Sequence, residues 1–288
     1  MFDTIHIKVS DIKINENIIN QYKIKDDFTY LDKNKSEITK HELRIDYIYI
    51  KYYTPIKKLT VETSVAEVMN NGKNNLVQSE FYAERFWINL NSILYKYLKI
   101  TIPKEEWTVS RLDITYDIKT KNIDNPIQKI SKLHFPKYNK SLYNDNESVM
   151  FSAKSSKIVV YNKQKQYISS KETTTNIQAA ANILRIEIRP SRYTVNQYDS
   201  SRKAVNLLTK QYADYISGKY HYNDILSQIK KRNRTKTPAP LSANNIKSME
   251  IIAGFMYLID TYGEKAVKES MTLSTFKNRK RLVKKTSI

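Results

Sequence analysis

The sequence predicts an α+β protein in which a mostly antiparallel sheet with flanking helices is followed by a small all-helical domain. Three observations lead to this prediction. Short apolar and β-branched runs recur through the first 190 residues, with helical patterns only at intervals. A basic, proline-containing segment then follows near residue 230, and only helical patterns lie beyond it. At about 150 residues per domain, the 288 residues allow one large domain and a smaller one.

Strands of the first domain are expected where apolar runs are bounded by clusters of Asn, Asp and Lys. These segments are 5–9, 44–53, 58–65, 109–118 and 183–188, with a hairpin whose arms are 148–153 and 157–163. Helices are expected where apolar residues recur every three or four positions, at 78–100, 123–133 and 201–217. The sequence contains no repeat of fixed period.

The segment KKRNRTKTPAP, which begins at Lys230, has five cations in seven residues followed by two prolines. This composition is typical of a linker. We therefore expect a catalytic domain over 1–229, a linker over 230–241 and a helical domain over 242–288. The last domain should contain helices at 246–262 and 264–271 and a third that Thr272 caps and that runs to about residue 285. Three short helices with tight connections are typical of a helix-turn-helix type module.

Charge indicates a polyanionic partner. The chain has 49 Lys and Arg against 29 Asp and Glu, a formal net charge of +20, and an isoelectric point near 9.7. Residues 201–288 carry 18 of the cations but only 6 of the acids. Such a surface favours nucleic acid, although a lysine-rich composition also produces ordinary solvated faces.

Composition also argues against several classes of protein. With no cysteine, the chain has no disulfide framework, thiolate metal cluster or cysteine nucleophile, and a reducing cytoplasm is expected. No apolar run reaches the ~18 residues of a membrane span, and no signal sequence is visible, so we expect no membrane partner. The four histidines, at positions 6, 41, 134 and 221, form neither a zinc pair nor a His-x-His pattern.

Three of the expected strands carry polar groups at every second position. These groups are Arg111, Asp113, Thr115 and Asp117 in the first strand, Tyr161 and Lys163 in the second, and Arg185, Glu187 and Arg189 in the third. Because successive side chains of a strand point to opposite sides, a sheet that buries the intervening aliphatics presents these groups on one face. If the strands are neighbours, Asp113, Glu187, Tyr161 and Lys163 meet there. An ordinary exposed face of Arg and Glu pairs, each worth ~0.2–1 kcal/mol, is the alternative.

This set of residues has a chemical use. The carboxylates of Asp113 and Glu187 offer hard oxygen ligands for Mg²⁺ or Mn²⁺. The Tyr161 hydroxyl, with an ordinary pKa of ~10, is a nucleophile for a phosphodiester if cations stabilise the phenolate and the phosphorane. Lys163 and the metal can supply that charge. A tyrosyl ester also retains the energy of the cleaved bond, so the strand can be resealed.

The ordered motifs resemble one known family. The series MFDTIHIKV, TVSRLDITYD, KIVVYNKQKQ and NILRIEIRPSRY is similar to the replication endonucleases of filamentous phages and related plasmids, the gene II/X type. The similarity covers most of residues 1–193, and the final TLSTFKNRKRLVKK resembles the family's C-terminal basic helix. The family often has S-x-x-K after its first hairpin, whereas this chain has Ser64 and then Glu67.

The resemblance implies an initiator of rolling-circle replication that nicks one strand at an origin, stays linked to the 5′ phosphate and leaves a 3′ hydroxyl for a polymerase. It places the catalytic tyrosine at Tyr161, with Lys163 beside it. The partners would be duplex and single-stranded origin DNA and a host helicase and polymerase. The first domain would be a permuted relative of the histidine-type nicking enzymes. Two other functions stay open: a non-enzymatic origin-binding initiator or repressor, and a conjugative relaxase, against which the missing histidine cluster counts.

Several residues have more than one interpretation. Tyr138, Tyr143 and Tyr167 are alternative nucleophiles or simple packing residues. His6 lies on the strand face of Thr4 and Lys8, so it is either a third metal ligand or a hydrogen-bonded strand histidine; Asp117 has the same two interpretations. Asp3 either caps or pairs with a neighbour.

DNA contacts are expected from three groups of cations. The first, beside the site, is Arg111, Arg185, Arg189 and Arg192, which can instead pair with Asp113 and Glu187. The linker group is Lys230, Lys231, Arg232, Arg234 and Lys236, which would add salt-sensitive, sequence-independent affinity. The tail group is Lys277, Arg279, Lys280, Arg281, Lys284 and Lys285. A helix with this last group suits a major groove or a row of phosphates, and a solvated basic helix is the alternative.

Overall fold

The computed structural model describes residues 2–72, 83–143, 147–230 and 243–286. The chain divides into two compact units, Met1–Lys230 and Lys231–Ile288. The first unit combines helices with a large antiparallel sheet, so the predicted α+β class is confirmed. The described part of the second unit contains helices alone.

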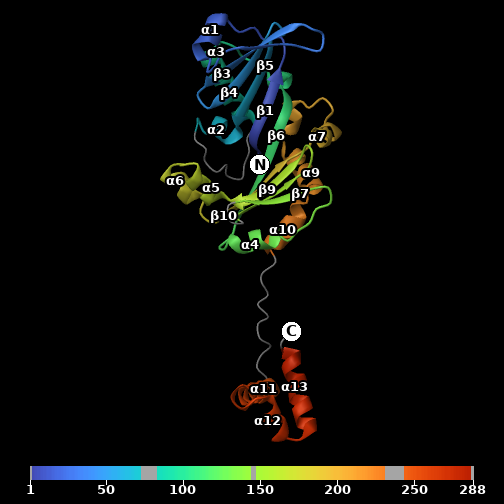
Figure 1. The fold of residues 1–288 in the computed structure, drawn as a ribbon. Coiled ribbons are helices and arrows are strands. Elements are labelled where there is room, and N and C mark those ends of the chain that lie inside the picture. The colour runs from blue at the N-terminus through green and yellow to red at the C-terminus, as the bar shows by residue number, and fades with distance from the viewer. Residues whose placement is uncertain (1, 73–82, 144–146, 231–242, 287–288) are drawn as a thin grey trace. The chain divides into compact units, whose positions relative to one another are not determined.

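In the described part of the first unit, ten strands form one sheet in the order β2-β3-β4-β5-β1-β6-β10-β9-β8-β7 (Figure 1). All of these strand pairs are antiparallel, as predicted. The strands are β1 (Phe2–Val9), β2 (Phe28–Leu31), β3 (Glu37–Ile45), β4 (Ile48–Thr54), β5 (Lys58–Ser64), β6 (Thr108–Lys119), β7 (Asn139–Tyr143), β8 (Ser148–Ser152), β9 (Lys157–Asn162) and β10 (Ile183–Arg189).

The sheet consists of two halves with the same connectivity. In each half a first strand is followed by a short helix, and four further strands form a meander whose last strand pairs back with the first. The first half is β1, α1 (Glu16–Tyr22) and β2 to β5; the second is β6, α4 (Asp124–Ile130) and β7 to β10. The two first strands, β1 and β6, pair with each other at the centre. The sequence shows no fixed-period repeat, because a pairing scheme depends on alternation and turns rather than on identical residues.

One face of the sheet is aliphatic in both halves. Leu43, Ile50, Val61 and Ile7 are successive cross-strand partners in the first half, and the corresponding side chains of the second half join the same buried cluster. Burial of each such side chain stabilises the fold by about 1.5–3 kcal/mol. Side chains from helices complete this cluster. The polar residues that alternate with the aliphatics therefore lie on the opposite face.

The remaining helices of the first unit connect the strands or follow the sheet. They are α2 (Val65–Met69), α3 (Ala83–Leu98), η1 (Lys104–Glu106), α5 (Lys163–Ser169), α6 (Thr174–Ala179), α7 (Arg192–Tyr198), α8 (Ala204–Leu207), α9 (Lys210–Lys219) and α10 (Tyr222–Lys230). The α3 helix lies within the predicted 78–100, whose first five residues lie outside the described residues. The predicted hairpin at 148–163 is present as β8 and β9.

Three predicted boundaries were wrong. Residues 44–53 are two strands, because the chain turns at Asp46 and Tyr47, where Asp46 has φ +50°. The predicted helix 201–217 is two helices, and the Thr209 side chain caps the second by accepting from the backbone of Tyr212. The third is the end of β9, which was predicted at residue 163 but lies at Asn162. The Asn162 side chain accepts from the backbone N–H of Lys165 and so caps α5, which begins at Lys163.

The second unit contains α11 (Ala243–Tyr262), α12 (Glu264–Glu269) and α13 (Leu273–Thr286). Phe255, Val267 and Phe276, one from each helix, form its small core. The predicted cap is confirmed, because Thr272 Oγ1 accepts from the backbone N–H of Thr275 at 3.3 Å. No helix in the described ranges of either unit has the length and apolar character to cross a membrane.

Candidate active site

The three strands that carry the predicted site are neighbours in the sheet, in the order β6-β10-β9. Their register places Arg185 between Asp117 of β6 and Tyr161 of β9. Glu187, two residues further along β10, lies opposite Thr115. Asp113, Tyr161 and Glu187, which were predicted to share one face, therefore do so.

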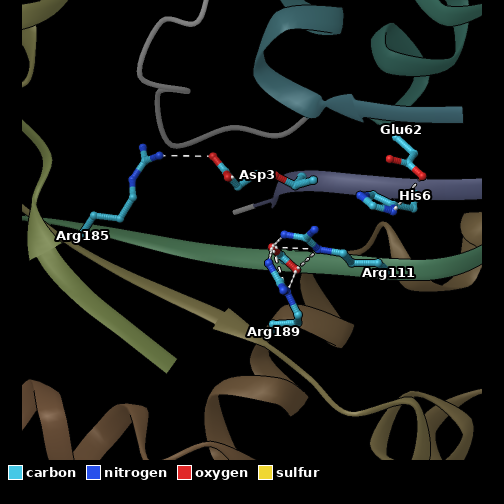
Figure 2. A network of polar contacts seen from close by, with 8 residues as sticks. Asp3, His6, Glu62, Arg111, Arg185 and Arg189 are labelled. Atoms are coloured by element: carbon cyan, nitrogen blue, oxygen red, sulfur yellow. Dashed lines mark hydrogen bonds and ion pairs between the residues drawn. The ribbon is translucent and has the colours of Figure 1, made fainter. Parts of the chain in front are cut away.

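Asp113 is the most buried member of this face, with 0% exposure. Arg111 Nε and Nη2 donate to its carboxylate at 2.5–3.2 Å, and Arg189 donates from β10 at 2.9–3.3 Å. Figure 2 shows these two guanidinium groups converging on the one carboxylate. Burial raises the pKa of Asp113, and the Arg111 guanidinium opposes that rise. The pairing interpretation of Arg111 and Arg189 thus holds for Asp113.

Arg185 is also committed to carboxylates. Its Nη1 donates to Asp3 at 3.2 Å (Figure 2). Its Nε and Nη2 each donate to Asp117 at 2.7 Å. Only 6% of its side chain is exposed. The prediction that Arg185 contacts DNA is therefore not supported, because a buried guanidinium with two carboxylate partners has little capacity left for a phosphate. It instead lies directly opposite Tyr161 and faces that residue with positive charge.

Glu187 has an unusually high proton affinity. Burial, together with the charges of Asp3 and Asp113, raises its pKa to about 7, and Arg185 opposes the rise. A carboxyl that titrates near neutral pH can accept or release a proton under physiological conditions.

Tyr161 is half-buried and lies among charged groups. Burial raises the pKa of its phenol, Glu187 and Asp3 act in the same direction, and Arg185 opposes the rise by charge and by a hydrogen bond. Because Glu187 lies two residues from the direct partner of Tyr161, the two side chains are diagonal neighbours on the sheet face.

Lys163 was predicted to lie in the β9 strand beside Tyr161, but it is the first residue of α5 and is buried. Its Nζ donates to Gln166 Oε1 at 2.8 Å and lies 4.1 Å from the ring centre of Tyr167. Burial, and after it the charge of Arg185, lowers the pKa of Lys163 to about 8. The Lys163 ammonium therefore still interacts with the charge of Arg185, although Lys163 lies on a helix and not on the β9 strand.

The alternative tyrosines are placed less favourably. Tyr167 lies near Arg185, but it is only 1% exposed, and burial raises its pKa to about 12. The hydroxyl of Tyr138 forms a hydrogen bond with Ser156. Tyr143 lies in β7, two strands away from Tyr161. Among these four tyrosines, Tyr161 alone is both partly exposed and adjacent to Glu187.

The arrangement does not fit the predicted metal pair as it stands. Both oxygens of Asp113 already accept from two guanidinium groups. Across the described ranges, no group of three or more His, Asp or Glu side chains is placed to hold a metal ion. A metal bound by Asp113 and Glu187 would have to displace Arg111 or Arg189.

His6 extends the polar face into the first half of the sheet. It lies opposite Glu62 on one side and Arg111 on the other, and its Nδ1 is 3.6 Å from Glu62 (Figure 2). Lys51 also pairs with Glu62, at 2.5 Å. Burial lowers the pKa of His6, and Glu62 opposes this. Sequence reasoning missed Glu62 and Lys51, although both alternate with buried aliphatics in β4 and β5.

The other predicted DNA contacts fall in three places. Arg192 is exposed at the start of α7. Lys230 ends α10 instead of beginning the linker, and Lys231, Arg232, Arg234 and Lys236 lie outside the described residues. The tail cations lie on α13, where Lys280 pairs with Glu264; for Lys284 and Lys285 only the helix, not the side chain, is described.

Comparison with models of known protein families gives no match, and no protein of curated function matches the chain.

Proposed function

We propose that the chain initiates rolling-circle replication by nicking and rejoining one DNA strand through a 5′-phosphotyrosine intermediate. One observation carries the proposal: Tyr161, Arg185 and Glu187 lie together on one sheet face, which fits a tyrosine that transfers a strand. The net charge of +20 supports a nucleic-acid substrate.

In the proposed reaction the phenolic oxygen of Tyr161 attacks a backbone phosphorus. A P–O bond to Tyr161 forms and the P–O3′ bond breaks. Because burial raises the pKa of Tyr161, the phenolate is scarce at neutral pH, so its proton must leave as the new bond forms. Glu187, with a pKa of about 7, accepts this proton, and the Lys163 ammonium, with a pKa of about 8, protonates the departing 3′ oxygen.

The cations around the site stabilise the negative charge of the phosphorane in this proposal. Arg185 contributes through its charge and not through a bond to the phosphate, because Asp117 and Asp3 hold its N–H groups. It faces Tyr161 and is fixed in position before the substrate arrives. Reversal of the same steps reseals the strand: the 3′ oxygen attacks the phosphotyrosine, Lys163 recovers its proton and Glu187 returns one to the phenol.

The second unit fits a DNA-binding role in the same proposal. Three helices around Phe255, Val267 and Phe276 include a basic third helix, α13, as a helix-turn-helix type module would. The partners would be duplex and single-stranded origin DNA and a host helicase and polymerase in the cytoplasm. A distant, permuted relationship of the first unit to histidine-type nicking enzymes is part of the proposal, and so is a requirement for Mg²⁺ or Mn²⁺.

The test is a nicking assay on a supercoiled plasmid that carries the DNA flanking the gene of this chain. With Mg²⁺ or Mn²⁺, we expect relaxed circles and protein attached to the 5′ end. Binding of the plasmid without relaxation or attachment would instead support the second candidate, a non-enzymatic initiator or repressor. The pairing of Asp113 with Arg111 and Arg189 favours this second candidate, because such pairs also occur on inert sheet faces.

A further inference from the structure

A row of alternating aromatic and cationic side chains crosses the first half of the sheet. The register makes Phe28 of β2 the partner of Lys40, Lys40 the partner of Tyr53, and Tyr53 the partner of Lys58. Tyr30 lies two residues from Phe28 on the same face, and the two rings stack with centres 6.0 Å apart. We call these five residues the aromatic track.

Two of the three aromatic rings of this track are exposed, and the third, that of Tyr53, is partly buried. Phe28 is 60% exposed and Tyr30 is 38% exposed, although β2 is an edge strand on which bare apolar groups promote aggregation. Lys40 Nζ lies 5.5 Å from the ring centre of Phe28, and Lys58 Nζ lies 5.3 Å from that of Tyr53. Rings kept exposed beside cations are suited to stack nucleobases and to hold the phosphates between them.

The track ends at a group of four cations, Lys58, Lys8, Arg192 and Arg202. They lie close enough for their charges to interact: burial, then repulsion from the other three, lowers the pKa of Lys8. The backbone explains the proximity, because Lys8 pairs with Thr108, and the carbonyl of Arg202 accepts from the next residue of β6.

Other cations on the same face differ from this group. Lys51 pairs with Glu62, and Lys40 pairs with Glu42. Within the described residues, by contrast, the structure shows no ion pair for Lys8, Lys58, Arg192 or Arg202. Beside Lys8 and Lys58 lies a cavity of about 380 Å³, which Thr108 and the acidic residues Asp11 and Glu106 also line, so the four cations outnumber the acids there by two. Excess positive charge at the end of a row of exposed rings is complementary to a single nucleic-acid strand.

We propose that the aromatic track and these cations bind single-stranded DNA, with bases on Phe28, Tyr30 and Tyr53 and phosphates at Lys58, Lys8, Arg192 and Arg202. The inference deepens the proposed function and rests on it, because it names the surface on which the opened strand lies. It predicts that the strand runs from β2 toward the centre of the sheet, where β1 meets β6.

The test is binding of fluorescein-labelled oligothymidylate to the full chain, followed by anisotropy, without any cleavage step. Phe28→Ala combined with Tyr30→Ala should weaken binding about tenfold or more, since each base stacked on a ring is worth ~1–3 kcal/mol. The matched control is Tyr95→Ala with Lys99→Gln, an exposed ring of α3 and the cation that follows the end of that helix, and it should bind like the native chain. Equal affinities of the two double variants would overturn the proposal.

The cations are tested by the salt dependence of the same binding. Lys58→Gln with Arg192→Gln should reduce the slope of log affinity against log salt by about 1.4, at ~0.7 for each phosphate that the protein no longer neutralises. An unchanged slope would count against these two cations as phosphate ligands. Tighter binding of oligouridylate, or equal binding of a duplex of the same length, would overturn the assignment to single-stranded DNA.

Two further measurements separate this inference from its rivals. If a second copy of the chain covers β2 instead, sedimentation of the free native protein will show a dimer that the Phe28 and Tyr30 substitutions dissociate, and the proposal fails. Tyr161→Phe should leave oligothymidylate binding unchanged. If Tyr161→Phe loses nicking but still binds oligothymidylate, the result supports the role of Tyr161 and does not affect the binding role of the aromatic track. If only the Phe28 and Tyr30 variant binds weakly, the result supports the track and does not affect the role of Tyr161.

Discussion

Arg189 of β10 donates to both carboxylate oxygens of Asp113 on β6, at 2.9–3.3 Å, and so joins two strands through a group that is wholly shielded from solvent. Arg111 binds the same carboxylate from its own strand. This pairing fixes the position of the Asp113 carboxylate, whose charge raises the pKa of Glu187. It gives Asp113 a role in holding the site together whether or not the site performs chemistry.

Asp113→Asn should destabilise the first unit by about 1.5–3 kcal/mol, because two guanidinium groups lose their charged acceptor. Urea unfolding followed by tryptophan fluorescence measures this, since Trp87 and Trp107 are both buried in that unit. The exposed Asp124→Asn is a suitable control and should change the free energy of unfolding little. A value for Asp113→Asn as small as that of the control would show that the pairing contributes nothing to stability.

Tyr161→Phe should reduce nicking and covalent attachment by roughly 10³-fold or more, the scale expected when a nucleophile is removed. Binding to the plasmid should stay within a few fold. Tyr167→Phe is the matched control, because this tyrosine lies near the same arginine but is buried. Attachment that persists in the first variant and disappears in the second would move the nucleophile to Tyr167.

Alternation of polar and apolar residues was enough to predict the shared face of Asp113, Tyr161 and Glu187, because side-chain direction in a strand follows from position alone. It was not enough for Lys163, since the helix that begins there depends on Asn162 as a cap. Periodicity says nothing about which strands are neighbours. The order β6-β10-β9, and hence the meeting of the three segments, required the structure.

The first half of the sheet was harder to predict. The four residues of β2 are too few for a clear pattern, so the partnership of Phe28 with Lys40 was not foreseen. Residues 44–53 form a nearly continuous run of aliphatic, aromatic and charged residues whose turn lacks Gly and Pro, which are the usual signals. The partners of Asp113 were open for another reason: the sequence offers several cations, and only register decides which of them reach it.

Chelation of divalent metal should stop nicking, and Mg²⁺ or Mn²⁺ should restore it. If the metal binds at Asp113, it competes with Arg189, so Arg189→Gln should raise the affinity for Mn²⁺ by about tenfold, the scale of outer-shell effects on a metal site. Titration calorimetry with MnCl₂ measures this independently of nicking. Asp113→Asn is the reference variant and should bind Mn²⁺ no more tightly than the native chain does. If the native, Arg189→Gln and Asp113→Asn chains all bind Mn²⁺ with the same affinity, the metal binds elsewhere.

Glu187→Gln should make both stability and nicking less dependent on pH. The folded state raises the pKa of Glu187 to about 7, above its ordinary value, so the folded state binds this proton more tightly than the unfolded state does. The stability that the protonated carboxyl contributes is complete below about pH 4.5 and is lost as pH rises through about 7. Glutamine cannot ionise, so the variant should be more stable than the native chain at pH 8, by up to about 3 kcal/mol, and nearly equal to it at pH 4.5.

The same substitution tests Glu187 as the proton acceptor. In the native chain, nicking should increase as pH rises through about 7, because the acceptor must be ionised, and Glu187→Gln should be slow at every pH. Glu105→Gln, on an exposed residue of η1, is the control for both measurements and should follow the native chain. If Glu187→Gln kept the native pH profile of nicking, Glu187 would not be the acceptor, whereas a constant difference in stability between pH 4.5 and 8 would show that its proton affinity is ordinary.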